Sequence, residues 1–510
     1  MAIKSYADFM NEISADELYE GLLGYGFFSE KLPPVFTAVP FFEYCVNNNP
    51  SFNQDWHDWI SYSTMRNVNI PRQLGIPTPM KYQKLCIVLR DNWSKIQQHF
   101  EEQTKTDTFC VSRLHLRKHK SSKALFEMNY KDWNVDGNPE TELLLTDSGA
   151  SRYLVKADIS TCFPSIYSHA IPWALAGKTE AKKHIGEDDF WYNKIDKACR
   201  GMKNGETHGL LIGPHTSNLL SEIILTVVDK KLIGYNYYRN IDDYDCYVDS
   251  YEKAQLFLRD LEDVLREYDL PLNHKKTKIL ELPIAITDSW IHKLGNQQLG
   301  TNYGKTTYSQ VNNYLDIAIN LTDDTNNAAV LKWAIKALSS QMLKENAKAL
   351  AGRRIMHLAV LNPYLLQLMD DYVFKPYGVD KDEIRTFTDA IFSEGERLHN
   401  NEAISYAFYY ALRYDFKIKG VDYQRILDRG DCISMLLCYL YALKENHGYR
   451  NATVLKPFKN KAKSLIETDM DRYWLFCYEI QTKGNLHGEW KGLKEAEVGF
   501  IKPEFVARRK

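Results

Sequence analysis

Two adjacent aspartates, Asp242 and Asp243, lie in the middle of the stretch YYRNIDDYDCYV, between apolar and aromatic residues. Alternation of this kind predicts two short strands that meet at a turn. A turn that needed only polarity could use Asn-Gly or Asp-Gly, whereas two neighbouring carboxylates repel each other. A third carboxylate, Asp158, ends a predicted strand in YLVKADISTCFPSI, 84 residues before Asp242.

Three carboxylates at the ends of two strands could hold two divalent cations about 3.5–4 Å apart. Oxygen ligands of this kind favour Mg²⁺, which binds substrate phosphates, and Mn²⁺ is the alternative ion. Bound cations would also explain why the repulsion between Asp242 and Asp243 is tolerated. Taken alone, an Asp-Asp pair has a simpler interpretation as a solvated turn.

The segments around these aspartates predict an α+β core. RYLVKADI is typical of a strand, and SNLLSEIILTVVDKKLI has apolar residues at helical spacing. The hairpin around Asp242 follows, and then a helix in YEKAQLFLRDLEDVLREY. This order predicts helices on one face of an antiparallel sheet.

Helical patterns dominate the sequence from about residue 305. Three of them begin near 404, 432 and 472, and this loose period indicates stacked helical pairs of the HEAT type. The segment NLTDDTNN, at 320–327, is interpreted as a linker close to the boundary of this region.

Composition limits the class of protein. The chain has 510 residues, 44% hydrophobic and 25% charged, with a net charge of −2, which argues against coating long nucleic acid through bulk positive charge. Nine single cysteines without zinc spacing argue against structural zinc and favour a reducing cytoplasm. We expect no signal peptide and no membrane span, and SMLLCYLYAL (434–443) is interpreted as a buried helix face.

Four ordered segments resemble the motifs of the reverse transcriptase family, over about residues 80–290. The resemblance implies a right-hand polymerase, with fingers and an N-terminal region at 1–145 and a palm at 146–305. An all-α, HEAT-like helical-repeat domain at 306–510 would replace the thumb. The segments are DISTCFPSI (158–166) for motif A, GLLIGPHTSNLL (209–220) for motif B, NIDDY (240–244) for motif C and LPLNHKKTKI (270–279) for motif D.

The resemblance implies roles in metal binding and catalysis. Asp158 and Asp242 would bind both metal ions, Asp243 would support them, and the carbonyl of Ile159 would complete a metal shell. Lys276 matches the motif D lysine, a candidate general acid for the departing pyrophosphate. Its simpler interpretation is a solvated surface lysine.

Other residues are candidates for nucleotide binding. Phe163 stands at the position of the family's steric gate, where an aromatic ring favours deoxynucleotides over ribonucleotides, unless it is a core residue. Gly213 permits close approach of the backbone to the nucleotide. Arg66 and Arg72, in a shortened fingers hairpin, would contact the triphosphate. The basic run SRLHLRKHKSSK (112–123) is either a path for a nucleic-acid backbone or a charged surface strand.

Motif B departs from the family pattern. Templated enzymes usually have Pro-Gln-Gly, whereas this chain has Leu211, Ile212 and Gly213. The side chain of Ile212 offers no hydrogen bond beside a nascent base pair. This departure leaves the metal chemistry intact and puts the copying of a template in doubt.

Further segments resemble bacterial abortive-infection reverse transcriptases, of the AbiK and P2-prophage types, and extend the resemblance over almost the whole chain. It implies a cytoplasmic anti-phage enzyme that makes DNA from dNTPs without a template. The DNA would be primed by a tyrosine and stay attached to it, and the chain would form a homo-oligomer, a trimer or hexamer. These segments include FFSEKLPPVFT (27–37), RQLGIPTPMKY (72–82) and RYWLFCYEI (472–480).

Three other functions remain open. The first is a templated RNA-directed DNA polymerase that works with a noncoding RNA. The second is a nucleotidyl cyclase, which would be expected to have a GG[DE]EF-like loop that this sequence lacks. The third is an inactive scaffold, against which the complete set of aspartates argues.

Overall fold

The computed structural model describes residues 6–53, 55–66, 71–105, 112, 118, 123–125, 143–146, 149–285, 288–297, 299 and 304–506. Most of the basic run 112–123 lies outside these residues, so the structure does not test its predicted role. The chain divides into two compact units. Unit 1 comprises 1–29, 37–60 and 75–284, and unit 2 comprises 30–36, 61–74 and 285–510.

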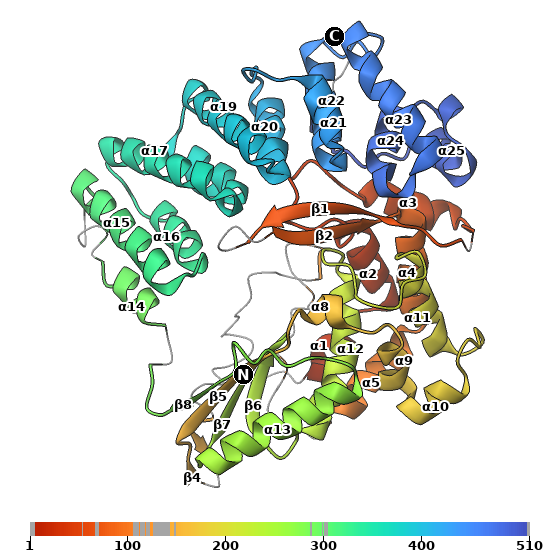
Figure 1. The fold of residues 1–510 in the computed structure, drawn as a ribbon, viewed down its shortest axis with the longest axis vertical. Helices are drawn as coiled ribbons and strands as arrows, with labels where there is room; N and C mark the ends of the chain where they lie inside the picture. Colours follow the sequence, from red (N-terminus) through yellow and green to blue (C-terminus); the bar gives the residue numbers. More distant parts are fainter. Residues whose placement is uncertain are drawn as a thin grey trace. The chain divides into compact units, whose positions relative to one another are not determined.

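A four-stranded antiparallel sheet in the order β6-β7-β5-β8 forms the centre of unit 1 (Figure 1). The strand and the hairpin predicted around the aspartates are both confirmed. The strands are β5 (Tyr153–Asp158), β6 (Asn236–Asn240), β7 (Asp243–Val248) and β8 (Lys278–Glu281).

Successive side chains of each strand point to opposite faces of the sheet, and both faces are partly covered. Val155, Tyr244 and Cys246 are completely buried on one face, and helix α13 (Tyr251–Glu267) packs against β5 and β7. The other face carries a small apolar cluster that includes Leu154 and Tyr247. Asp158 and Asp243 lie on this second face, beyond the cluster.

Helices make up most of the remainder of unit 1. Helix α12 is buried along almost its whole length, which explains its long apolar sequence. Helices α4 and α5 are separate because Asn92 ends α4, and the side-chain amide of Asn92 donates to the carbonyl of Val88 (2.9 Å). The main helices are α1 (Tyr6–Asn11), α2 (Ala15–Glu20), α3 (Val39–Asn48), α4 (Pro79–Asp91), α5 (Trp93–Thr104), α8 (Cys162–Ser165), α9 (Ala170–Ala176), α10 (Lys178–Lys183), α11 (Trp191–Gly201) and α12 (Thr216–Lys231).

Strands β1 (Trp59–Met65) and β2 (Pro71–Pro77) form a separate two-stranded sheet. The ends of these strands that are nearest each other in sequence, within 61–74, belong to unit 2, and their outer ends belong to unit 1. A further short pair, β3 (Leu145–Thr146) and β4 (Gly149–Ala150), precedes the central sheet.

Unit 2 is otherwise helical, as the sequence predicts. Successive helices pack side by side, α15 on α17, α17 on α19, α19 on α20, α20 on α22 and α22 on α24 (Figure 1). The longer helices are α14 (Ser289–Gly295), α15 (Tyr308–Thr325), α16 (Ala329–Ser339), α17 (Glu345–Leu361), α19 (Lys381–Leu398), α20 (Asn401–Tyr414), α21 (Tyr423–Arg429), α22 (Cys432–Glu445), α23 (Lys456–Thr468), α24 (Trp474–Ile480) and α25 (Gly488–Glu495).

Two expectations about this region have definite outcomes. The linker predicted at 320–327 is wrong, because α15 continues to Thr325 and ends at Asn326, which takes the left-handed conformation of a helix cap. The buried helix predicted at 434–443 is confirmed in α22. Among the helices that the structure describes, none is both long and apolar enough to cross a membrane.

Candidate active site

The three predicted aspartates come together at one end of the central sheet. The register of β5 and β7 places Asp158 directly opposite Asp243. The backbone N–H of Ile159 donates to the carbonyl of Asp242 (3.0 Å), which continues the pairing past the end of the strand. Asp158 is buried, with 5% of its surface exposed. The alternating sequence of the hairpin is therefore sufficient to bring these carboxylates to one edge.

The turn that carries Asp242 has an unusual backbone. Asn240 and Asp243 are paired, so the loop contains only Ile241 and Asp242. Ile241 has a φ of 57°, a conformation that is costly for a β-branched side chain and is found where surrounding contacts enforce it. One such contact is a hydrogen bond that Nη1 of Arg239 donates to the carbonyl of Ile241 (2.8 Å).

Arg239 is the centre of a buried ionic cluster beneath this turn. Its side chain has no exposed surface and donates to Glu222 (2.8 and 3.1 Å) and to Asp229 (2.6–3.1 Å). Both acids lie on α12, and the hydroxyl of Ser112 donates to Glu222 (2.5 Å). The cluster fixes the helix that follows motif B to the turn of motif C.

Sequence reasoning missed this cluster, although two signals were present. Arg239 is a charged residue inside an otherwise apolar strand, and Glu222 and Asp229 are seven residues apart on an apolar helix. A spacing of seven places two side chains on the same helical face. A lone charge on a buried strand needs a partner of opposite sign, and the two acids on the apolar helix need a buried cation for the same reason.

The motif D segment docks on Asp158. Nζ of Lys276 donates to Oδ1 of Asp158 (2.8 Å), and Nδ2 of Asn273 donates to Oδ2 (2.7 Å). Desolvation lowers the pKa of Lys276, but the hydrogen bond to Asp158 and the nearby negative charges outweigh it and raise the pKa above its ordinary value. Lys276 is therefore a protonated side chain held at the carboxylates. Asn273 was not singled out from the sequence.

The donor set fits a divalent cation by its chemistry. Desolvation, followed by the negative charges of Asp242 and Asp158, raises the pKa of Asp243 to about 7, and a cation would relieve this repulsion. Within the described part of the chain, no group of three His, Cys, Asp or Glu side chains is arranged so that it could hold a metal ion. Asp158 is bonded to Lys276 and Asn273 instead, so its metal-binding role stays a prediction.

Phe163 lies one turn beyond Asp158, on the short helix α8. Its side chain is half-buried, and its carbonyl accepts a hydrogen bond from the N–H of Leu210 (2.8 Å). The motif A turn is thereby attached to the start of motif B. The partial exposure of the ring is compatible with a steric gate, which also stays a prediction.

The motif B loop is hydrogen-bonded to Gly75 of β2, within unit 1. The N–H of Gly75 donates to the carbonyl of Ile212 (2.9 Å), and Ile212 is half-buried. Gly213 has a φ of 130° and an added Cβ would lie 3.4 Å from the carbonyl of Gly75, so glycine suits both the conformation and the close approach. The position that usually bears an amide thus presents an apolar side chain.

The two predicted fingers arginines belong to unit 2, whereas the aspartates belong to unit 1. Arg66 is exposed and Arg72 is half-buried. Burial and the positive charges of Arg72, Lys332 and Arg66 lower the pKa of Lys31 to about 8. The buried carboxylate of Glu402 accepts the N–H of Met65 (2.7 Å) within the same unit. The predicted contact of the arginines with a triphosphate is not tested by these positions.

Comparison with known proteins agrees with this geometry. Residues 80–308, slightly less than half of the chain, match the family model described as reverse transcriptase (RNA-dependent DNA polymerase). This range contains all four motifs, the aspartates and Lys276. No curated protein matches the sequence.

Several solved structures resemble the chain weakly. Telomerase of Candida tropicalis, truncated of its C-terminal domain, is 14% identical, with 46% of this chain and 51% of that chain covered and a TM-score of 0.30. The apo telomerase of that organism is 13% identical, with coverages of 82% and 71% and a TM-score of 0.33. Telomerase of Candida albicans with a fragment of telomeric RNA is 11% identical, with coverages of 81% and 66% and a TM-score of 0.30.

These values carry no argument about activity or partners, and the chain spans about half the length of the first of these structures. The family match rests on the segment that contains the aspartate site, and the sheet, the hairpin and the helices around that site have the arrangement that the four motifs require. Residues 80–308 are therefore similar to the reverse transcriptase domain that the family model describes.

Proposed function

We propose that this polymerase makes DNA from dNTPs without a nucleic-acid template, primed by a tyrosine of its own chain, in bacterial defence against phage. The nucleotidyl transfer itself is supported by one observation above the others, the register that places Asp158 opposite Asp243 with Asp242 in the adjoining turn. The finer parts of the proposal rest on the motif B loop and on the resemblance of the sequence to abortive-infection reverse transcriptases.

The residues of the site would have different roles in phosphoryl transfer. Asp158 and Asp242, with Asp243 and the Ile159 carbonyl in support, would hold two divalent cations, Mg²⁺ or Mn²⁺, which supply neutralisation of phosphate charge. Lys276 carries a proton at the same edge of the sheet and is placed to protonate the departing pyrophosphate.

Absence of a template is proposed from the chemistry of the motif B loop. Ile212 presents an apolar side chain, and its carbonyl is already bonded to Gly75. The side chain therefore contributes no hydrogen bond by which a base pair could be checked. A site of this kind selects nucleotides by shape and stacking rather than by pairing.

Priming by the protein would supply the attacking hydroxyl at high effective concentration, without the entropy cost of recruiting a second molecule. The chain has 33 tyrosines. Among those that the structure describes, the exposed ones are Tyr25, Tyr251, Tyr308 and Tyr449. Each of these four hydroxyls is a candidate primer. A homo-oligomeric assembly and a bacterial cytoplasmic location are further parts of the same proposal.

Denaturing electrophoresis of the protein expressed in bacteria tests the proposal. A shift in mobility that survives boiling in detergent and disappears with DNase is expected for DNA attached through a tyrosine. Mass spectrometry of the nuclease-treated protein then identifies the modified residue. An Asp242→Asn variant should lack the shift.

The alternative is a templated RNA-directed DNA polymerase that works with a noncoding RNA, which the wording of the matching family favours. Sequencing of the product decides between the two. Product that leaves the protein on denaturation and is complementary to a co-purified or supplied RNA would establish the alternative and refute template-free synthesis.

A further inference from the structure

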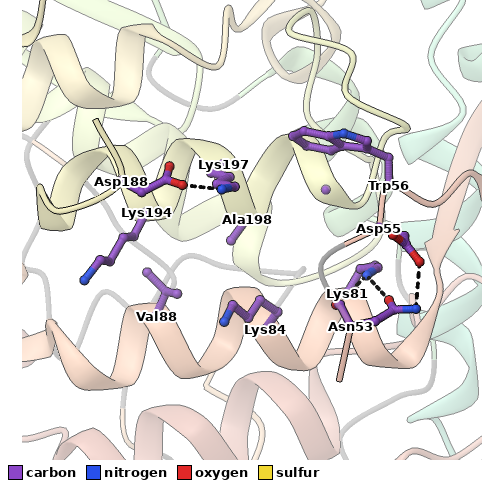
Figure 2. A pocket seen from close by; sticks show the side chains of 11 residues that line it. Asn53, Asp55, Trp56, Lys81, Lys84, Val88, Asp188, Lys194, Lys197 and Ala198 are labelled. Carbon is purple, nitrogen blue, oxygen red and sulfur yellow. Dashed lines mark hydrogen bonds and ion pairs between the residues drawn. The ribbon is translucent and has the colours of Figure 1, made fainter. Parts of the chain in front are cut away.

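A cavity whose lining includes four lysines lies in unit 1, away from the four motifs. It has a volume of about 190 Å³ and is bounded by α4, by α11 and by Asn53, Asp55 and Trp56 (Figure 2). None of its lining residues belongs to motifs A to D. Pockets for drug-sized ligands measure about 300–1,000 Å³, so this cavity is too small to enclose a large cofactor.

Positive charge dominates the lining, with four lysines against two aspartates. Lys197 is paired with Asp188. Lys81 is 4% exposed, and its ammonium donates to the backbone carbonyl (2.9 Å) and the side-chain oxygen (3.0 Å) of Asn53. The buried ammonium of Lys81 therefore adds positive charge to the wall of the cavity.

Lys84 and Lys194 supply the other two charges. Both are exposed, one on α4 and one on α11. Figure 2 shows Lys84 below the centre of the pocket and Lys194 at its side, neither joined to another lining residue by a dashed line. In the described part of the chain, neither ammonium makes a hydrogen bond or ion pair, so both are available to an anion.

An aromatic surface completes the site. The indole of Trp56 lies across the upper side of the pocket in Figure 2 and is 42% exposed. The guanidinium of Arg200 is 5.5 Å from the centre of its ring, and Gly205 packs against the same ring, where an added Cβ would lie 3.7 Å away. These contacts hold the ring in place while much of it remains open to a ligand.

We propose that this cavity binds a nucleotide unit, with the phosphate between Lys84 and Lys194 and the base stacked on Trp56. Lysines that follow a phosphate and an aromatic ring that accepts a base are the combination by which proteins hold single-stranded nucleic acid. A free nucleotide and one unit of a single strand share this chemistry. The site extends the proposed function and does not depend on it.

Binding of a fluorescein-labelled eight-residue oligothymidine to the full-length protein, measured by anisotropy in EDTA over a range of salt, tests the site. Each phosphate contact contributes about 0.7 to the slope of log K against log salt for single strands. Because the proposed site holds one phosphate between the two lysines, Lys84→Ala/Lys194→Ala should flatten the slope by about 0.7. Trp56→Ala should weaken binding about fivefold or more through lost stacking.

The matched control is Lys183→Ala/Lys230→Ala, which removes two exposed lysines of the same unit from α10 and α12 and should leave the slope unchanged. Thermal melting checks that each variant is folded. Competition by dTMP as well as by the oligomer identifies a free-nucleotide site, and competition by the oligomer alone identifies a strand site. Unchanged affinity and slope in folded variants of all three residues would overturn the proposal.

Discussion

Asp158 and Asp243 face each other across two strands, and Asp245, two residues further along β7, lies on the same face. Asp245 accepts the hydroxyl of Tyr238 (2.7 Å) and pairs with Lys156 (3.4 Å). Asp245 thus lies on the same strand and face as Asp243 and is also an aspartate, but its carboxylate is bonded to Tyr238 and Lys156. This contrast makes it a matched control for the chemistry of the site.

Asp158→Asn or Asp242→Asn should reduce nucleotide incorporation by at least about 10²–10³-fold, the range found when one charge-stabilising group is lost. The substitutions remove like charges without changing side-chain size, so the melting temperature should not fall. Incorporation of labelled dNTP with Mg²⁺ or Mn²⁺ measures the effect. Asp245→Asn should retain activity, and a folded, fully active Asp242→Asn would refute the assignment.

Phe163→Ala should raise the use of ribonucleotides relative to deoxynucleotides by about tenfold or more, because removal of the ring opens space beside the 2′-carbon. The measurement is the ratio of kcat/KM for the two sugars with the same base. Phe163→Tyr keeps the ring and serves as the control, with an unchanged ratio. If Phe163→Ala lowers the melting temperature and leaves the ratio alone, the residue is a packing residue.

At the scale of elements, β6 and α12 are joined through Arg239, which donates to two acids of the helix and to the turn at Ile241. Removing one partner of a buried ionic cluster leaves uncompensated charge and costs about 3–5 kcal/mol. The same removal frees the carbonyl of Ile241, whose left-handed conformation depends on its surroundings. Stability and turn geometry should therefore change together.

Arg239→Met is expected to destabilise unit 1 by about 3–5 kcal/mol and to raise the metal concentration needed for half-maximal incorporation. Denaturant unfolding and metal titrations of activity measure the two effects. Arg239→Met/Glu222→Gln should recover part of the stability without recovering the metal dependence. Exposed Arg266→Met on α13 is the control. Recovery of both properties together would show that Arg239 acts on stability alone.

The elements around the site could be predicted because their patterns are local. The strand before Asp158, the hairpin at Asp242 and the helix after motif B each follow from short-range alternation or helical spacing. The hydrogen bonds of Asn273 and Lys276 to Asp158 join residues more than 100 positions apart. No local pattern in the sequence indicates such a contact. The resemblance to the family identified Lys276 as a site residue, whereas the contacts of Asn273 and Arg239 became visible only in the structure.

The same distinction explains the misplaced linker. NLTDDTNN is polar and contains turn-forming residues, which favour a loop on propensity alone. Its first residues continue an amphipathic helix whose apolar side includes Leu315, Ala318 and Leu321, all buried. Packing against a neighbouring helix stabilised the helical conformation beyond the point where local propensity would have ended it.

At the scale of the whole molecule, a buried carboxylate links distant parts of unit 2. Glu402 on α20 accepts the N–H of Met65 on β1, and burial raises the pKa of Glu402 to about 8. A carboxyl whose pKa is higher in the folded than in the unfolded chain binds more protons when folded. Its contribution to stability is therefore lost as the pH rises from about 5 to 8.

Glu402→Gln should remove this part of the pH dependence. The free energy of unfolding of the wild type should fall relative to the variant by about 1.4 kcal/mol per pH unit across this window, up to a few kcal/mol. Hydrogen exchange of α20 amides at pH 5 and pH 8 measures the local stability. Exposed Glu495→Gln on α25 is the control, and parallel curves for wild type and Glu402→Gln would contradict the shift.

The route of the chain through its two units has a consequence for synthesis on the ribosome. The chain passes from one unit to the other after residues 29, 36, 60, 74 and 284. The segments 30–36 and 61–74 therefore emerge long before the helices with which they fold. At about 5–20 residues per second, Met65 waits on the order of half a minute for Glu402. A gene truncated after residue 284 would yield strands with missing neighbours, prone to aggregate, rather than a free-standing polymerase core.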